Sequence, residues 1–124
     1  MRLEQIRTEQ LAHNSYFISS NGQALVVDPR RDCQVYMDLA QQEEAFVLHV
    51  LETHRNEDYV HGSLELGRRT GATILHSSAL EFKYGTPVHE GHQVRVGDVE
   101  VTTLETPGHT DDSLSFVLRD RSVS

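Results

Sequence analysis

The stretch Leu51-Glu-Thr-His-Arg-Asn-Glu-Asp-Tyr-Val-His61 holds three side chains that can bind a metal, directly behind an apolar run. These side chains are His54, Asp58 and His61. A loop after a buried strand is a common place for ligands, because the sheet fixes the backbone while the side chains converge. The stretch therefore predicts a strand, a metal-binding loop and then a helix.

Apolar runs and turn residues on both sides of this stretch predict the strands. Successive apolar residues over 24–27 and 46–51 are typical of strands covered on both faces. Asn21-Gly22 between apolar runs predicts a hairpin, because both residues accept a positive φ. The other expected strands are 3–8, 15–19, 73–75, 93–96, 99–104 and 113–118.

Helical spacing of apolar residues predicts two main helices. One is expected over 33–43 with Asp32 as its cap, and the other from Asp58 or Tyr59 to Thr70. Val60, Leu64 and Gly67 are expected on one face of the second helix. Hairpins, two β-α steps and hairpins again predict an α/β (α+β) fold with a mixed β-sheet.

Size and charge limit the possible functions. The chain has 124 residues, 37% of them hydrophobic, which predicts a single domain over 1–124. A formal net charge of -8 argues against nucleic acid and against an anionic membrane surface as partners. Cys33 is the only cysteine, which fits a reducing, cytoplasmic compartment and a buried, unreactive thiol.

A second histidine site lies downstream in Thr106-Pro-Gly-His-Thr110. Pro107-Gly108 predicts a tight turn after a strand, which would present His109 at the strand end. Two imidazoles and a carboxylate on one ion suit zinc or ferrous iron.

Each of these residues also has a simpler interpretation without metal binding. Asp58 can be a helix cap, in competition with Asn56, and His61 can be a solvated helix residue. His49, inside an apolar strand, is expected to be a hydrogen-bonded core histidine. Surface or turn positions are expected for His13, His76, His89 and His92.

Taken together, Thr53-His-Arg-Asn-Glu-Asp-Tyr59 and Thr106-Pro-Gly-His-Thr110 resemble the metallo-β-lactamase superfamily, in its glyoxalase II and persulfide dioxygenase branch. The proteins that fuse such a domain to rhodanese domains are the most similar, which implies a rhodanese domain in a longer parent protein. The resemblance implies the first half of an αββα sandwich. The later aspartate of the family pattern is absent, so we expect a truncated domain.

The family signature T-H-x-H-x-D-H has Asn56 in place of its second histidine and Tyr59 in place of its last. These departures argue against a dinuclear zinc site, because asparagine and tyrosine are poor replacements for imidazole. The persulfide dioxygenases, which this chain resembles, use one iron. The resemblance therefore implies Fe(II) bound by His54 and His109, with Asp58 orienting the site. Zn(II) is the alternative metal, and His61 a substitute ligand.

The resemblance implies a persulfide dioxygenase that acts on glutathione persulfide or a similar small thiol derivative. A zinc-dependent glyoxalase II-like thioester hydrolase is the alternative. Another interpretation is an inactive half-domain that binds a partner or itself, because half a sandwich would leave one sheet face uncovered and an open edge at 113–118. This interpretation predicts a homodimer, and domain swapping is one way in which it could form.

Overall fold

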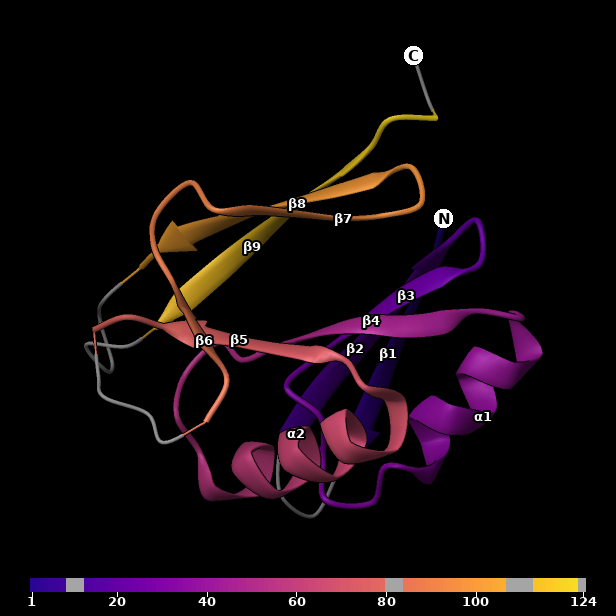
Figure 1. Ribbon diagram of the computed structural model, residues 1–124, viewed down its shortest axis with the longest axis horizontal. Helices are drawn as coiled ribbons and strands as arrows, with labels where there is room; N and C mark the ends of the chain where they lie inside the picture. Colours follow the sequence, from indigo (N-terminus) through magenta and orange to yellow (C-terminus); the bar gives the residue numbers. More distant parts are fainter. Residues whose placement is uncertain (9–12, 80–83, 107–112, 123–124) are drawn as a thin grey trace.

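The computed structural model describes residues 1–8, 13–79, 84–106 and 113–122 and arranges them in three layers. Two helices, a six-stranded sheet and a three-stranded sheet make up these layers. Figure 1 shows the helices below, the larger sheet in the middle and the smaller sheet above. The helices are α1 (Gln34–Gln42) and α2 (Glu57–Thr70). Two helices with a mixed sheet confirm the expected fold class.

The middle sheet has the strand order β1-β2-β3-β4-β5-β6. Neighbours from β1 to β3 pair antiparallel, and those from β3 to β6 pair parallel. The strands are β1 (Arg2–Thr8), β2 (His13–Ser20), β3 (Gln23–Val27), β4 (Phe46–Leu51), β5 (Thr73–Ser77) and β6 (Thr86–Val88).

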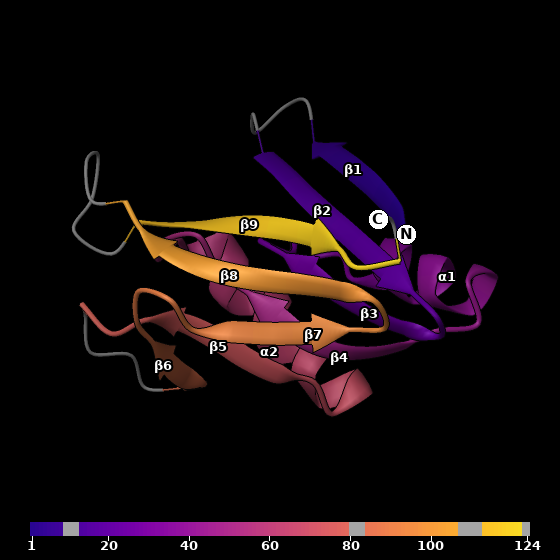
Figure 2. The same cartoon turned by 90° about the horizontal axis from the view of Figure 1, so that it is seen from above.

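The upper sheet is an antiparallel meander in the order β7-β8-β9. Its strands are β7 (Gln93–Val96), β8 (Val99–Glu105) and β9 (Leu114–Asp120). Figure 2 looks down on this sheet and shows that it covers part of the middle sheet. The expected strands are confirmed, whereas β6 was missed, because three residues are too few to show a pattern.

Both helix starts differ from the prediction. Cys33, not Asp32, is the cap residue of α1, and the Asp32 carboxylate instead accepts a bond from the Gln34 amide at 3.1 Å. Helix α2 begins at Glu57, so Asn56 occupies the cap position, and its carbonyl accepts the Val60 amide at 2.9 Å.

The inward face of α2 also differs from the prediction. Leu64 is 45% exposed, and the buried residues are Gly62, Ser63 and Leu66. A Cβ at Gly62 would collide with the carbonyl oxygens of Pro29 and Arg30, so the helix approaches this loop through its glycine. The spacing of apolar residues correctly predicted a helix. It predicted the wrong buried face, because the close backbone approach at Gly62 brings a neighbouring face of the helix inward.

Two hydrophobic clusters hold the three layers together. One lies between the helices and the middle sheet and includes Phe17, Tyr36 and Leu66. The other lies between the two sheets and includes Leu25 and Val99. The expectation of only two layers was wrong, because β7 to β9 fold back over the middle sheet and form a third layer. One sheet face is uncovered as expected: it is the outer face of the upper sheet, where Val117 is 49% exposed.

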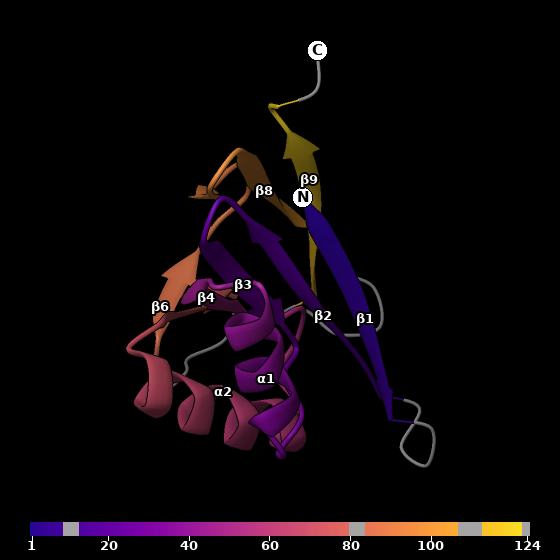
Figure 3. The same cartoon turned by 90° about the vertical axis from the view of Figure 1, so that its right-hand side faces the viewer.

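The upper sheet leaves an apolar groove beside its edge strand β9, as the order β7-β8-β9 leaves that edge open. Figure 3 shows β1 and β2 extending beyond the helices on this side. The groove has a volume of about 350 Å³. We call it the β9 groove; it is lined by Leu3, Tyr16, Ile18, Val27, Thr53, Leu114, Ser115, Phe116 and Leu118. Among the described residues, no helix has the length and apolar character needed to cross a membrane.

Candidate metal site

The candidate site lies where the parallel strands β3 and β4 end. Backbone bonds hold these ends in line: the Asp28 amide donates to the Leu51 carbonyl at 2.8 Å, and the Glu52 amide to the Leu75 carbonyl at 3.0 Å. The carboxyl ends of parallel strands meet at one edge of a sheet, which is where α/β proteins commonly bind ligands. The side chains that follow β3 and β4 are therefore brought together.

Asp28 follows β3 and is buried in a left-handed backbone conformation, with φ of 52°. Its carboxylate accepts two bonds from Thr53, from the amide at 2.7 Å and from the hydroxyl at 2.6 Å. Burial and, as the smallest contribution, the charge of Glu52 raise the pKa of Asp28 to about 7, against the lowering effect of these bonds. A non-glycine residue in this conformation is strained, and such strain is concentrated at functional sites.

His54 continues this chain of contacts. Its Nδ1 lies 3.0 Å from the Thr53 hydroxyl oxygen. The edge of its ring meets the ring of Tyr59, with centroids 5.0 Å apart and planes at 73°. Tyr59 is the residue that replaces the last histidine of the signature, so this position of α2 packs against His54 instead of supplying a second imidazole.

A second buried carboxylate lies next to this chain. Glu52 is 1% exposed, and the Tyr84 hydroxyl donates to both of its carboxylate oxygens at 2.8 Å. Burial raises the pKa of the Tyr84 phenol, and the bond to Glu52 raises it further. The bond ties the strand end that carries His54 to a residue 32 positions away.

The ends of the second histidine loop are fixed beside His54. The Thr106 amide donates to the Ser113 carbonyl at 3.0 Å, and the Leu114 amide donates to the Thr53 carbonyl at 2.6 Å. The described residues Ser113 and Leu114 are thus held at the residue that precedes His54. His109 itself lies outside the described residues, and its role as a ligand stays a prediction.

The other predicted ligands have different outcomes. The side chain of Asp58 is also outside the described part of the structure. His61 is exposed and lines an open hollow together with Glu65 and Arg69 of α2 and with Arg31, Asp32 and Cys33, which precede α1. Within the described residues, no three His, Cys, Asp or Glu side chains lie close enough to hold a metal together.

Three residues with simpler expected roles can be compared directly. Cys33 is buried, and burial raises the pKa of its thiol, which agrees with the unreactive role expected for it. His49 is half-buried, but its Nδ1 has no hydrogen-bond partner among the described residues, so the expected bond is wrong at this atom. Burial lowers the pKa of His49.

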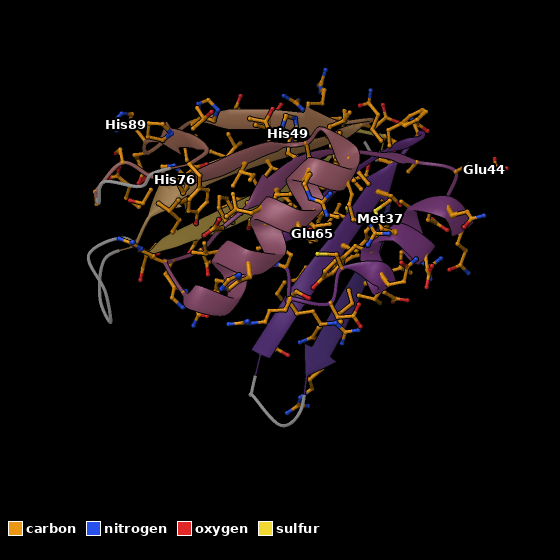
Figure 4. The ribbon with its side chains drawn as sticks, turned by 60° about the horizontal axis from the view of Figure 1, so that its bottom comes forward. Met37, Glu44, His49, Glu65, His76 and His89 are labelled. Atoms are coloured by element: carbon orange, nitrogen blue, oxygen red, sulfur yellow. The ribbon has the colours of Figure 1, made fainter. Side chains whose placement is uncertain are left out.

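The expected surface or turn position for His76 was wrong. The residue is 3% exposed, and its two ring nitrogens lie 3.0 Å from the Ser77 carbonyl and 2.7 Å from the Tyr84 carbonyl. In Figure 4, His76 and His89 lie at one end of the molecule and Glu44 at the other. His76 thus helps to hold Tyr84, whose hydroxyl reaches Glu52.

Reasoning from sequence missed Asp28, Glu52 and Tyr84 as parts of the site. The first two had a usable signal, since each is an acidic residue directly after an apolar strand, where parallel strands bring side chains together. Tyr84 had none, because its contact with Glu52 depends on the tertiary fold.

Comparison with known proteins identifies the family. A family model described as "Metallo-beta-lactamase superfamily" matches residues 8–123. The chain therefore belongs to the metallo-β-lactamase superfamily.

Two solved structures and one curated relative are particularly informative. A metallo-β-lactamase from Staphylococcus aureus superimposes with a TM-score of 0.87 at 29% identity, covering 96% of this chain and 37% of that one. ETHE1 from Myxococcus xanthus superimposes with a TM-score of 0.83 at 34% identity, covering 95% and 54%. A hydroxyacylglutathione hydrolase from Cereibacter sphaeroides is 29% identical over 130 residues, covering 100% of this chain and 51% of the relative.

These matches show that the three layers correspond to part of the metallo-β-lactamase fold. They also confirm the expected relationship to glyoxalase II, under the name hydroxyacylglutathione hydrolase, and to the persulfide dioxygenases, of which ETHE1 is one. The chain spans about half or less of the length of the curated relatives that it matches first.

Proposed function

We propose that this protein forms the His54-bearing part of a persulfide dioxygenase that uses a single ferrous ion. Its substrate would be glutathione persulfide or a similar small thiol derivative. His54 and His109 would hold the metal, and Asp58 would orient the site or hydrogen-bond a ligand.

The contact between Tyr59 and His54 carries this proposal. Tyr59 stands where the signature has its last histidine, and its ring packs against that of His54 at 5.0 Å. Asn56 likewise replaces the second histidine. A dinuclear site would lack both of these imidazoles, whereas a mononuclear site needs only His54, His109 and a carboxylate.

The chemistry of the donor set fits such an ion as far as the structure describes it. His54 offers an imidazole at a strand end, and its Nδ1 is engaged by the Thr53 hydroxyl, as is usual for histidines that bind metals. A bound ferrous ion supplies open coordination positions for a sulfur substrate and O₂. The protein's own residues supply the fixed position of the imidazole and a partly apolar surrounding, since the β9 groove reaches Thr53.

A second candidate function is the hydrolysis of a glutathione thioester with zinc. The observation that favours it is the name of the curated relatives, several of which are called hydroxyacylglutathione hydrolase. This activity would use the same His54 and His109.

The two functions are separated by supplying each metal and each substrate in turn. The metal-free form of a longer parent chain that includes the later aspartate of the family pattern is loaded with Fe(II) or Zn(II) and given glutathione persulfide under air or a hydroxyacylglutathione thioester. In the proposed reaction, one O₂ and one water convert the outer persulfide sulfur to sulfite and release the glutathione thiol. We expect O₂ uptake with iron that is lost in His54→Ala; thioester hydrolysis with zinc and no O₂ uptake with iron would contradict the proposal.

A further inference from the structure

We propose that Asp28 and Thr53 are positioning residues that fix the neutral His54 ring with its proton on Nδ1. The lone pair then lies on Nε2, the nitrogen left to bind a metal. The use of that lone pair rests on the proposed function, but the state of the ring does not.

The direction of the hydrogen bonds follows from the Thr53 hydroxyl group, which has a single hydrogen. Its oxygen lies 2.6 Å from one carboxylate oxygen of Asp28 and 3.0 Å from Nδ1 of His54. An ionised carboxylate can only accept hydrogen bonds. The hydroxyl hydrogen is therefore directed at Asp28, and the hydroxyl oxygen presents a lone pair to His54.

The consequence for His54 follows directly. Facing a lone pair, Nδ1 makes a favourable contact only if it carries the proton. In a neutral imidazole the other nitrogen is then the acceptor, because only one of the two nitrogens is protonated. Asp28 thus sets the tautomer of His54 through the Thr53 hydroxyl group.

The backbone holds the three groups in place. The second carboxylate oxygen of Asp28 accepts the Thr53 amide at 2.7 Å, so the carboxylate cannot turn away without losing two bonds. The Leu114 amide fixes the Thr53 carbonyl at 2.6 Å. Asp28 keeps its left-handed conformation within this network, which indicates that the surroundings determine where its carboxylate points.

The tautomer can be read by NMR in the metal-free, ¹⁵N-labelled full chain. The measurement is made at about pH 8.5, above the pKa of about 7 of Asp28, so that the carboxyl group is ionised. We expect long-range ¹H–¹⁵N correlations to show His54 with a protonated Nδ1 and an unprotonated Nε2. A wild-type spectrum with the proton on Nε2 would overturn the proposal.

Three variants test how the tautomer is set. Thr53→Ser keeps the hydroxyl group and should keep the proton on Nδ1, whereas Thr53→Val removes it and should release the ring to a mixture or to the Nε2–H form. In Asp28→Asn, the side-chain amide can donate to the Thr53 oxygen, which turns the hydroxyl hydrogen toward His54 and should move the proton to Nε2. If the proton of His54 stays on Nδ1 in both Thr53→Val and Asp28→Asn, the proposal is contradicted.

Metal affinity separates this inference from the proposed function. For Fe(II) or Zn(II), we expect Thr53→Val to weaken binding by roughly 10–100-fold, while Thr53→Ser stays close to the wild type. If the tautomers behave as expected and neither metal binds the wild-type chain, the proposed function is wrong and the positioning role stands. If the amide spectrum shows that Thr53→Val is unfolded, Asp28→Asn provides the test of the tautomer instead. Its side chain has the same shape as that of the wild type.

Discussion

At the scale of single residues, the site contains two buried carboxyl groups, each held by a hydroxyl group. Asp28 accepts from Thr53, and Glu52 accepts from Tyr84. Each bond reduces the cost of burying a polar group, and each links segments that are far apart in sequence. The two pairs lie on neighbouring strand ends, so stability and the position of His54 depend on the same residues.

The raised pKa of Asp28 predicts how the stability of the metal-free protein depends on pH. The folded pKa is about 7, against an ordinary value of 3.8. Between these values the folded state keeps a proton that the unfolded state loses, so the free energy of unfolding falls as pH rises, by at most roughly 4 kcal/mol. Urea unfolding of the wild type and Asp28→Asn should show this fall only in the wild type. Equal pH dependence in both proteins would refute the assignment.

Tyr84→Phe tests the second pair. The substitution leaves the Glu52 carboxylate buried without the phenol donor, so we expect a loss of about 1–3 kcal/mol in the free energy of unfolding. Urea unfolding measures it. Glu52→Gln tests the same bond from the other side. Removing the carboxylate charge should lower the pKa of the Tyr84 phenol, which titration of the tyrosine absorbance measures. A fully stable Tyr84→Phe would show that this bond contributes nothing.

At the scale of helices and strands, local patterns were sufficient for most elements. The bounds of β4, Phe46–Leu51, agree with the predicted strand, because six successive residues with one hydrophilic member leave few alternatives. The inward face of α2 was wrong, since Gly62 contacts a loop about 30 positions earlier, and no periodicity encodes such a contact. His54 could be found because its motif is local in sequence. Tyr84 could not, because its contact with Glu52 depends on the tertiary fold.

Gly62→Ala tests this close approach of α2. A methyl group at this position would meet the carbonyl oxygens of Pro29 and Arg30, so we expect a loss of about 1–3 kcal/mol in stability. Gly67→Ala in the same helix is the control, because its new methyl group comes no closer than 3.2 Å, to the flexible end of the Ile74 side chain, and meets the Ala72 carbonyl oxygen at an ordinary 3.7 Å. Alanine also favours the helix. Thermal unfolding of both variants measures the difference; equal melting temperatures would contradict the close packing at Gly62.

At the scale of the whole molecule, the open edge of β9 and its groove are the features that a partner would cover. The bonds Thr106–Ser113 and Arg121–Asp98 show that odd-numbered residues of β9 bond toward β8. The backbone groups of Phe116 and Leu118 therefore face the open edge. An antiparallel β9 from a second copy would pair with them and extend the upper sheet over the β9 groove.

We accordingly propose a homodimer in which the open β9 edges of two copies pair with each other. Val117 is 49% exposed on the outer face of the edge strand. We expect Val117→Lys to shift a dimer toward monomer, because charged residues on edge strands oppose pairing, and Val117→Thr to leave it unchanged. Light scattering over a range of concentrations measures the mass; a wild-type monomer at the highest concentration would contradict the proposal.

The central claim is that His54 and His109 hold one metal ion, and the most direct measurement of it is metal stoichiometry. Fe(II) or Zn(II) is titrated into the apoprotein, and bound metal per chain is determined for the wild type, His54→Ala, His109→Ala and, as a control, His89→Ala. We expect one ion per chain in the wild type and in His89→Ala, with binding lost in each of the other two. Wild-type binding in His109→Ala would contradict the account.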